Sequence, residues 1–184
     1  MTRSKLTRKH SQEDKLIFTS EDLRWATPEI VAEYRATRLK CKTIVDIGCG
    51  IGFQSFAFAK QCQKVYAIEI DKNKIEKAKN NAAILGIKNI EFIQANALND
   101  ALILTLNGVD IVFCDPERLA TETERSTDTI KPNITQLLGK YSKLTQNIAI
   151  EFPPQIKTVP FDAEQEYISI EGVCQVATAV KREE

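Results

Sequence analysis

The chain has 184 residues, which is enough for one domain with a proper core and too few for two ordinary ones. Lysine plus arginine equals aspartate plus glutamate at 25 each, so the summed charge does not indicate a nucleic-acid partner. The longest apolar stretches have the length of strands and are interrupted by charge. We therefore expect no signal peptide and no membrane span, and we predict a cytoplasmic protein.

The first fifteen residues combine little apolar content with a cluster of basic side chains: Arg3, Lys5, Arg8, Lys9 and Lys15. Such a composition is typical of a mobile segment. We predict a basic flexible tail over residues 1–17 and a single domain, with a helical extension at its start, over residues 18–184. The tail is either a solvated terminus or an arm that contacts RNA, and the composition leaves both readings open.

A helix is expected before the first strand. Thr27 followed by Pro28 predicts an N-cap and a proline at the first helical position. Ile30, Val31, Tyr34 and Leu39 then form an apolar stripe, which would cover a sheet.

From residue 43 onward, apolar strand patterns alternate with helical patterns, which predicts an α/β fold with a parallel sheet and helices on both faces. One helix follows the first strand, one runs from Asp71 as N-cap to Gly86, and shorter ones are expected near 98–106 and 130–144. The last two strands are separated only by Gly172 and its neighbours, so they must form an antiparallel hairpin. Seven strands are expected: Thr43–Ile47, Lys64–Ile70, Ile90–Gln94, Val109–Cys114, Asn147–Phe152, Glu166–Glu171 and Val173–Val180.

A glycine-rich turn follows the first strand. Gly48, Gly50 and Gly52 let the backbone turn sharply and approach a ligand without a Cβ in the way. Dinucleotide sites use G-x-G-x-x-G to seat a pyrophosphate, whereas this turn reads G-x-G-x-G with Asp46 two residues ahead. The Asp46 carboxylate would repel a pyrophosphate and suits a cationic ligand.

An acid ends the second strand. Ligands of open α/β sheets bind at the carboxyl ends of the strands, so Glu69 is placed to accept hydrogen bonds from the two hydroxyls of a ribose. The whole run from residue 43 to 71 resembles motif I and the following strand of class I methyltransferases, which use S-adenosyl-L-methionine (SAM), a cofactor with a sulfonium and an ammonium group. The resemblance implies a Rossmann-like seven-stranded sheet and SAM as cofactor. A dinucleotide site and a degenerate pocket are the alternatives.

The same resemblance assigns the adenine contacts. Ile70 would cover one face of the ring, and the loop with Asn96 and Ala97 takes the place where such enzymes often carry an acid followed by a small residue. The Asn96 amide can accept from the exocyclic amine and donate to a ring nitrogen. The alternative is that Asn96 caps the following helix.

The fourth strand ends in Asp115, Pro116, Glu117 and Arg118. This run resembles the D/N-P-P-aromatic tetrad of enzymes that methylate exocyclic amines. In that tetrad, oxygens accept the hydrogens of the amine and the aromatic ring stacks on the base. Asp115 and Pro116 match the first half, whereas Glu117 and Arg118 replace the second proline and the aromatic residue. An arginine plane can itself stack on a base or hold a phosphate, so we predict catalytic roles for Asp115, Pro116 and Arg118.

Two RNA-modifying families resemble the chain over about residues 18 to 180. The run from Arg24 to Glu33 looks like the segment ahead of motif I in the trimethylguanosine synthase family, which methylates guanine N2 in RNA. Methyltransferases with a THUMP-like domain share the helix pattern and have D-P-A-R-R where this chain has D-P-E-R. The first resemblance implies that Thr27, with Phe18, folds over the SAM site, although the stacking tryptophan of that family has no counterpart after Pro116. The helix pattern consists of Thr27, Glu29, Ala32, Arg35, Ala36 and Arg38.

The cysteines argue against two further kinds of site. Five cysteines contain no C-x-x-C pair and the only histidine is His10, so neither a disulfide framework nor a zinc or other metal site is expected. Cys49 and Cys114 lie at strand ends and could be nucleophiles, but small buried thiols more often serve packing.

The leading hypothesis is a SAM-dependent methyltransferase that acts on RNA (tRNA, rRNA or a small RNA) at an exocyclic guanine nitrogen. A second keeps the SAM site and gives it a small molecule or protein, with Arg118 holding a carboxylate or phosphate. A third is a SAM-binding protein without catalysis that supports a partner subunit. We expect no DNA partner and no membrane.

Overall fold

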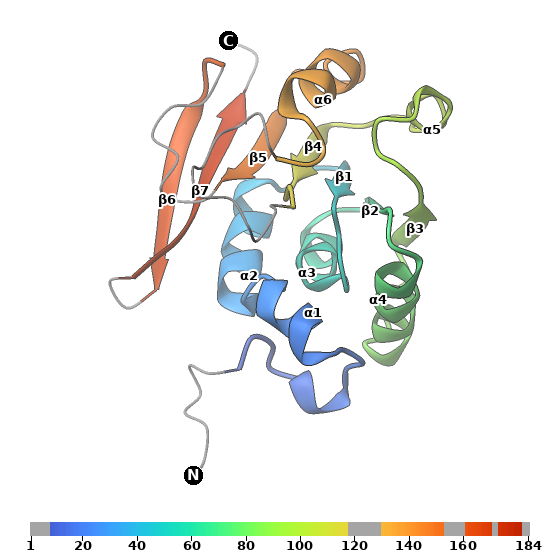
Figure 1. Ribbon diagram of the computed structural model, residues 1–184, viewed down its shortest axis with the longest axis vertical. Coiled ribbons are helices and arrows are strands. Elements are labelled where there is room, and N and C mark those ends of the chain that lie inside the picture. Colours follow the sequence, from blue (N-terminus) through green and yellow to red (C-terminus); the bar gives the residue numbers. More distant parts are fainter. Residues whose placement is uncertain (1–7, 118–129, 153–160, 171–172, 182–184) are drawn as a thin grey trace.

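The computed structural model describes residues 8–117, 130–152, 161–170 and 173–181 (Figure 1). In these residues one sheet runs in the order β3-β2-β1-β4-β5-β7-β6. The first five strands along the chain pair in parallel, and β7 is antiparallel to both β5 and β6. The strands are β1 (Thr43–Ile47), β2 (Lys64–Glu69), β3 (Ile90–Gln94), β4 (Ile111–Cys114), β5 (Ile148–Phe152), β6 (Glu164–Ile170) and β7 (Val173–Lys181).

The predicted α/β class with a parallel sheet is confirmed, and β1 and β3 have the predicted bounds. The fourth strand begins at Ile111 rather than Val109, and β6 begins at Glu164, two residues earlier than expected. Strands β6 and β7 pair in the antiparallel sense, as predicted. The residues that join them, 171 and 172, lie outside the described residues.

Helices cover both faces of the sheet (Figure 1). Helices α2 (Glu29–Arg38), α3 (Phe53–Gln61) and α4 (Lys72–Ile84) pack on one face, and α5 (Asp100–Ile103) and α6 (Ile134–Tyr141) pack on the other. Ile44 therefore points to α2 and α3, whereas Val45 points to the opposite cluster. A strand that is buried on both faces has no polar side, which is why the patterns read as continuous apolar runs. No helix in the described part of the chain is long and apolar enough to cross a membrane.

The apolar stripe predicted for α2 is wrong in two of its four members. Val31 and Leu39 are buried, but Ile30 is 66% exposed and Tyr34 is 46% exposed. The buried face is completed by two alanines and by a charged side chain, Arg35. A hydrophobicity pattern predicts an arginine to be exposed, because it does not include the ion pairs and hydrogen bonds that allow a charged side chain to be buried. The two alanines are Ala32 and Ala36.

The start of α2 also differs from the prediction. Pro28, not Thr27, occupies the N-cap position, and no side chain caps the helix. The first free backbone donor is satisfied from outside the helix, because the Glu29 amide donates to the Lys9 carbonyl at 2.7 Å. The N-terminal segment therefore takes over the function expected of Thr27.

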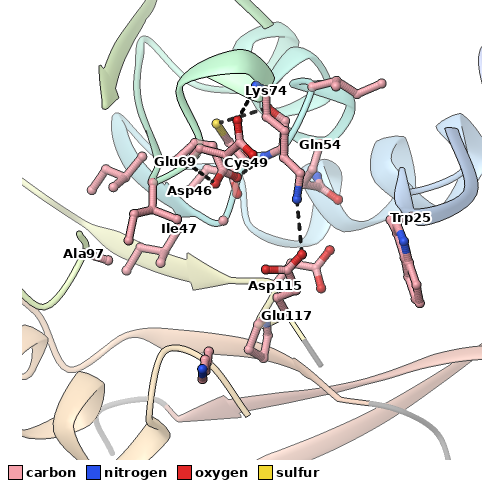
Figure 2. A pocket seen from close by; sticks show the side chains of 18 of the residues that line it. Trp25, Asp46, Ile47, Cys49, Gln54, Glu69, Lys74, Ala97, Asp115 and Glu117 are labelled. Atoms are coloured by element: carbon pink, nitrogen blue, oxygen red, sulfur yellow. Dashed lines mark hydrogen bonds and ion pairs between the residues drawn. The ribbon is translucent and has the colours of Figure 1, made fainter. Parts of the chain in front are cut away.

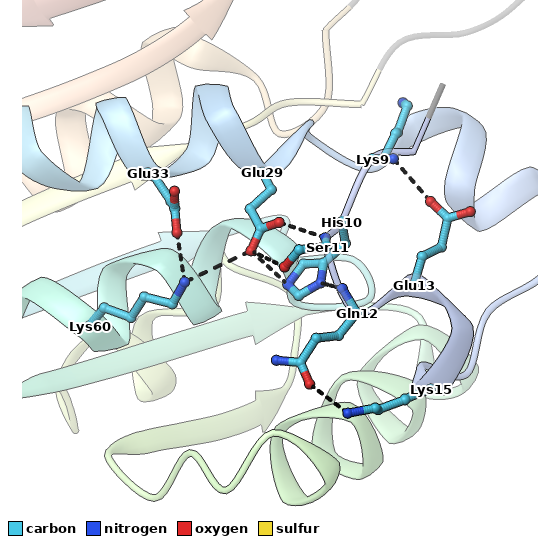
Figure 3. Close-up of polar contacts among 9 residues, drawn as sticks. All are labelled: Lys9, His10, Ser11, Gln12, Glu13, Lys15, Glu29, Glu33 and Lys60. Atoms are coloured by element: carbon cyan, nitrogen blue, oxygen red, sulfur yellow. Dashed lines mark hydrogen bonds and ion pairs between the residues drawn. The ribbon is translucent and has the colours of Figure 1, made fainter. Parts of the chain in front are cut away.

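The prediction of a flexible tail does not hold for residues 8–17. His10 is buried, with its ring centroid 5.0 Å from that of Phe53, and Ser11 donates from its backbone and hydroxyl to the Glu29 carboxylate at 2.6 and 3.0 Å (Figure 3). A short 3-10 helix, η2 (Glu13–Lys15), follows, and Leu16 is buried. The composition showed that this segment is charged. It could not show that the carboxylates of Glu13 and Glu29 accept hydrogen bonds from it.

Two of the basic side chains of this segment bind to other parts of the same chain. Arg8 pairs with Asp14 at 2.8 Å, and the Lys9 ammonium donates to the carbonyls of Arg24 and Ala26. An RNA-binding arm is therefore not supported for the described part of this segment. Arg3 and Lys5 lie outside the described residues.

Candidate functional site

A cavity of about 900 Å³ lies at the carboxyl edge of the parallel strands (Figure 2). Of the predicted catalytic residues, Asp115 and Pro116 line it, and Arg118 lies outside the described residues. Gly52 does not line the cavity and instead occupies the N-cap position of α3. The tertiary structure thus gathers the predicted residues from five separate segments of the chain. The predicted cofactor residues that line the cavity are Thr27, Asp46, Gly48, Gly50, Glu69, Ile70, Asn96 and Ala97.

The glycines of the turn serve different purposes. Gly48 has φ +80°, and a Cβ there would lie 2.6 Å from the Asp115 carbonyl oxygen; Gly52 has φ +96°, and a Cβ would lie 2.5 Å from the Phe56 ring. A Cβ on Gly50 would meet nothing within 4 Å. Two glycines are thus required by the packing of the protein itself, and open space remains beside Gly50.

Glu69 holds the glycine turn in place. Its Oε2 accepts from the Gly50 amide at 3.0 Å and its Oε1 accepts from the Asp71 amide at 2.9 Å (Figure 2). Each carboxylate oxygen has a second lone pair, so the side chain can accept further hydrogen bonds from a ligand in the cavity. The sequence predicted the ligand contact of Glu69 but not its contact with the loop.

Asp46 is fully buried beneath the turn and lines the cavity. Its Oδ2 accepts from the Ser55 hydroxyl, while its Oδ1 has no hydrogen-bond partner among the described residues. Burial raises the pKa of Asp46 to about 7, against the opposing effect of the Ser55 hydrogen bond. A buried carboxylate oxygen without a partner fits the cationic ligand that the sequence predicted.

The loops after β2 and β3 give the cavity an apolar and an amide surface. Ile70 is largely exposed and lines the cavity together with Asn96 and Ala97. Asn96 Oδ1 accepts from the Leu98 amide at 2.9 Å, whereas the N-cap of α5 is Asn99. The alternative in which Asn96 caps this helix is therefore wrong, and its side chain instead shapes the loop.

The residues after β4 also line the cavity. The Asp115 amide donates to the Ile47 carbonyl at 3.0 Å and so continues the pairing of β4 with β1. Glu117, which stands in place of a second proline, accepts from the Lys74 ammonium at 3.2 Å (Figure 2). Its backbone forms a two-way bridge with Lys131, at 2.8 and 3.0 Å.

Sequence reasoning missed Glu151, which lines the cavity from β5, the strand next to β4. Its Oε2 accepts from Arg35 Nη2 at 2.6 Å, and Arg35 is only 2% exposed. Arg35 also donates to Gln54 Oε1 at 2.6 Å and lies 4.8 Å from the Phe113 ring centroid. The available signal was an acid inside an otherwise apolar strand, since such a residue needs a buried partner.

The N-terminal segment contributes Thr27, which the resemblance placed at the site, and two further residues that sequence reasoning missed, Trp25 and Ala26. Trp25 ends helix α1 (Ser20–Trp25), and Ala26 and Thr27 follow it directly. Phe18, which the resemblance placed there, does not line the cavity and packs against the apolar cluster of α3 and α4. The resemblance thus indicated the right segment and, in Phe18, a residue that faces the core.

The two cysteines at strand ends behave as packing residues. Cys49 and Cys114 are buried, and burial raises the pKa of each thiol well above its usual value. Neither thiol is therefore prepared for nucleophilic attack at neutral pH.

A parallel α/β sheet with a glycine turn and an acid at its carboxyl edge defines a cofactor-binding protein of the Rossmann-like class. A family model described as a methyltransferase domain matches residues 39–170, and the chain belongs to this family. Among curated relatives, the 23S rRNA (uracil(1939)-C(5))-methyltransferase RlmD of Legionella pneumophila is 36% identical over 93 residues, which are 48% of this chain and 21% of that protein. The chain spans about a fifth of the length of the first curated relatives that it matches.

Solved structures share the fold at low sequence identity. A crystal structure of a Porphyromonas gingivalis W83 protein, provisionally described as a methyltransferase, matches with a TM-score of 0.77 and 15% identity over 89% of this chain and 42% of that one. A Streptococcus mutans protein, described in the same way and solved with S-adenosylhomocysteine (SAH), matches with a TM-score of 0.55 and 14% identity over 85% and 98% of the two chains. These matches confirm that the chain has the predicted Rossmann-like fold.

Proposed function

We propose that this chain is a SAM-dependent methyltransferase that methylates an exocyclic base nitrogen in RNA, with guanine N2 as the leading acceptor. One observation carries the proposal: a single cavity joins a cofactor end, formed by Asp46, Gly50 and Glu69, to an acceptor end at Asp115. Family membership supports the activity. When bound, SAM supplies a methyl group on a positively charged sulfur.

The residues of the cofactor end fit this group. Glu69 retains lone pairs for the ribose hydroxyls while it holds Gly50 in place. Asp46 Oδ1, buried and without a partner among the described residues, would accept from the cofactor ammonium. Ile70 would cover the adenine ring, and Asn96 with Ala97 would contact its edge.

The charge of the cavity favours a neutral amine over a phosphate at the acceptor end. Carboxylates outnumber ammonium groups among the described residues that line the cavity, so an anion would meet repulsion there and an N–H donor would meet acceptors. In the proposed mechanism Asp115 accepts the hydrogens of the amine and so directs its lone pair, while the RNA phosphates stay outside. The carboxylates are Glu21, Asp22, Asp46, Glu69, Asp71, Asp115, Glu117 and Glu151, and the ammonium groups are Lys74, Lys77 and Lys131.

The relatives support the RNA substrate of this proposal, and the residues of the site support a nitrogen acceptor. The RlmD relative is named for uracil C5, a carbon that becomes nucleophilic after a nucleophile adds to the neighbouring ring position. Cys49, the cysteine among the described residues that line the cavity, is buried and has a raised thiol pKa. The described site thus favours an acceptor that already carries a lone pair. Guanine N2 is chosen because the run from Arg24 to Glu33 resembles the trimethylguanosine synthase family.

A transfer assay separates this proposal from its alternatives. The purified chain is incubated with SAM labelled in the methyl group and with separate pools of RNA, protein and small metabolites from cells. We expect label in RNA, recovered after nuclease digestion as an N-methylated nucleoside, and a large loss of label with Asp115→Asn. Label confined to protein or metabolites would contradict the RNA proposal, and no transfer to any pool would favour a non-catalytic partner.

A further inference from the structure

The N-terminal segment places an aromatic side chain at the cavity. Trp25, at the end of α1, lines the cavity and is 52% exposed, and Figure 2 shows its indole at one side of the space into which Asp115 and Glu117 project from another. The Arg24 guanidinium lies 5.1 Å from its ring centroid. A large aromatic side chain left this exposed on a fixed helix has a free face for a ligand.

Several polar contacts fix this helix. The Lys9 ammonium donates to the carbonyl oxygens of Arg24 and Ala26, on either side of Trp25, at 2.7 and 2.6 Å. These carbonyls belong to the end of a helix and would otherwise lack intrahelical partners. Lys9 thus holds the backbone that carries the indole.

The other end of the segment is tied to α4. Asp22 accepts from Lys77 at 2.6 Å, and Thr19 and Asp22 form a reciprocal capping box. Ile17 exchanges two backbone hydrogen bonds with the buried Asn81 side chain, at 2.7 and 3.0 Å. These contacts keep the conformational entropy lost on binding low, which favours a stacking surface formed in advance.

The Lys9 ammonium also interacts electrostatically with two carboxylates that line the cavity. Burial lowers the pKa of Lys9, while the negative charges of Asp115 and Glu151 act in the opposite direction. The ammonium that binds the carbonyls of Arg24 and Ala26 is thus influenced by carboxylates of the cavity.

We propose that Trp25 is the stacking surface for the acceptor base and that it supplies the aromatic contact missing after Pro116. The inference rests on the proposed function, since it assumes that a planar base enters the cavity. Stacking on an aromatic side chain does not depend on which base is stacked. Any unpaired base that enters the cavity could therefore stack on the indole.

Fluorescence tests the contact directly, because Trp25 is the only tryptophan of the chain. The protein is saturated with SAH and then titrated with a single-stranded oligoribonucleotide of mixed sequence. We expect the oligonucleotide to quench the emission beyond any change caused by SAH. Trp25→Phe, which keeps a ring, provides the fluorescence baseline.

Kinetics with three variants give a second reading. Trp25→Ala should raise KM for RNA and lower kcat/KM about tenfold or more, while SAM affinity stays unchanged and Trp25→Phe retains most of the activity. Ile30→Ala is the matched control, because Ile30 is also exposed, lies on the neighbouring helix and does not line the cavity. Its kinetics should match those of the original chain.

The failures of the two proposals are distinguishable. Absence of quenching by RNA in the SAH-saturated protein would overturn the role of Trp25, as would normal kcat/KM in Trp25→Ala when the original chain methylates RNA. Quenching by SAH alone, with no further effect of RNA, would assign the indole to the cofactor and also overturn the inference. Quenching by RNA without methyl transfer would support the stacking contact and count against the proposed function.

Discussion

Gly48 lies against the backbone of Asp115 so closely that a Cβ on the glycine would stand 2.6 Å from the Asp115 carbonyl oxygen. The first residue of the glycine turn and the first residue after β4 are thus in direct contact, 67 positions apart in the chain. The proposed cofactor end and the proposed acceptor end of the cavity therefore meet at this contact.

Gly48→Ala should therefore disturb both ends. The positive φ alone costs about 1–2 kcal/mol in a residue with a Cβ, and the collision with Asp115 adds to it. Gly50→Ala is the matched control, because Gly50 also has positive φ but an unobstructed Cβ position. Thermal unfolding should show a larger drop in Tm for Gly48→Ala, and equal drops would remove the contact from the explanation.

Asp115→Asn should separate catalysis from cofactor binding. The amide keeps the size of the side chain but replaces one acceptor oxygen with a donor that faces the N–H groups of the acceptor. We expect turnover to fall about a hundredfold while the Kd for SAM, measured by calorimetry, stays the same. An equal loss of SAM binding would assign Asp115 to the cofactor end instead.

Glu69→Gln should weaken SAM binding about ten- to a hundredfold, because charge-assisted hydrogen bonds to ribose are lost. The variant should also unfold at a lower temperature, since the amide nitrogen of glutamine cannot accept from Gly50 or Asp71. Calorimetry against SAH and a thermal melt measure the two effects separately. Unchanged SAH affinity would remove Glu69 from the ribose contact.

Asp46 should make stability depend on pH. Its pKa in the folded chain is raised from 3.8 to about 7, so the folded state binds more protons than the unfolded state between these values. The free energy of unfolding should therefore fall as pH rises from about 4 to about 7, by at most about 1.4 kcal/mol per pH unit, and the contribution should be constant above pH 7. Urea unfolding of the original chain and Asp46→Asn checks this, because the slope that differs between them belongs to Asp46.

The same group should link cofactor binding to pH. If Asp46 Oδ1 accepts from the cofactor ammonium, ionised Asp46 binds SAM more tightly, and SAM affinity should rise from pH 6 to pH 8. Calorimetry in buffers of different ionisation enthalpy should detect release of a proton on binding. An affinity that is independent of pH would separate Asp46 from the ammonium.

The buried ion pair of Arg35 and Glu151 should be sensitive to loss of one partner. Glu151→Gln leaves the Arg35 guanidinium buried with a weaker acceptor, and removal of one member of a buried pair costs about 3–5 kcal/mol. Arg35→Met combined with Glu151→Gln should cost less than the sum of the two single substitutions. Urea unfolding gives the coupling, and strict additivity would show that the pair contributes no coupling energy.

The sequence by itself determined the elements whose signals are local. The apolar run of β1, the glycines that follow it, the acid at the end of β2 and the Asp71 cap of α4 all lie where the pattern places them. These signals are local because strand periodicity, positive φ and N-capping depend on a few neighbouring residues.

Only the tertiary structure decided which charged and polar side chains are buried and with which partners. Arg35 and Glu151 are 116 positions apart, Ile17 and Asn81 are 64 apart, and neither pairing leaves a trace in local periodicity. The packed segment around His10 and the exposed indole of Trp25 follow from such pairings. A charged residue is buried when its partner offsets the cost of desolvation, and that partner is brought into reach by the fold rather than by the chain.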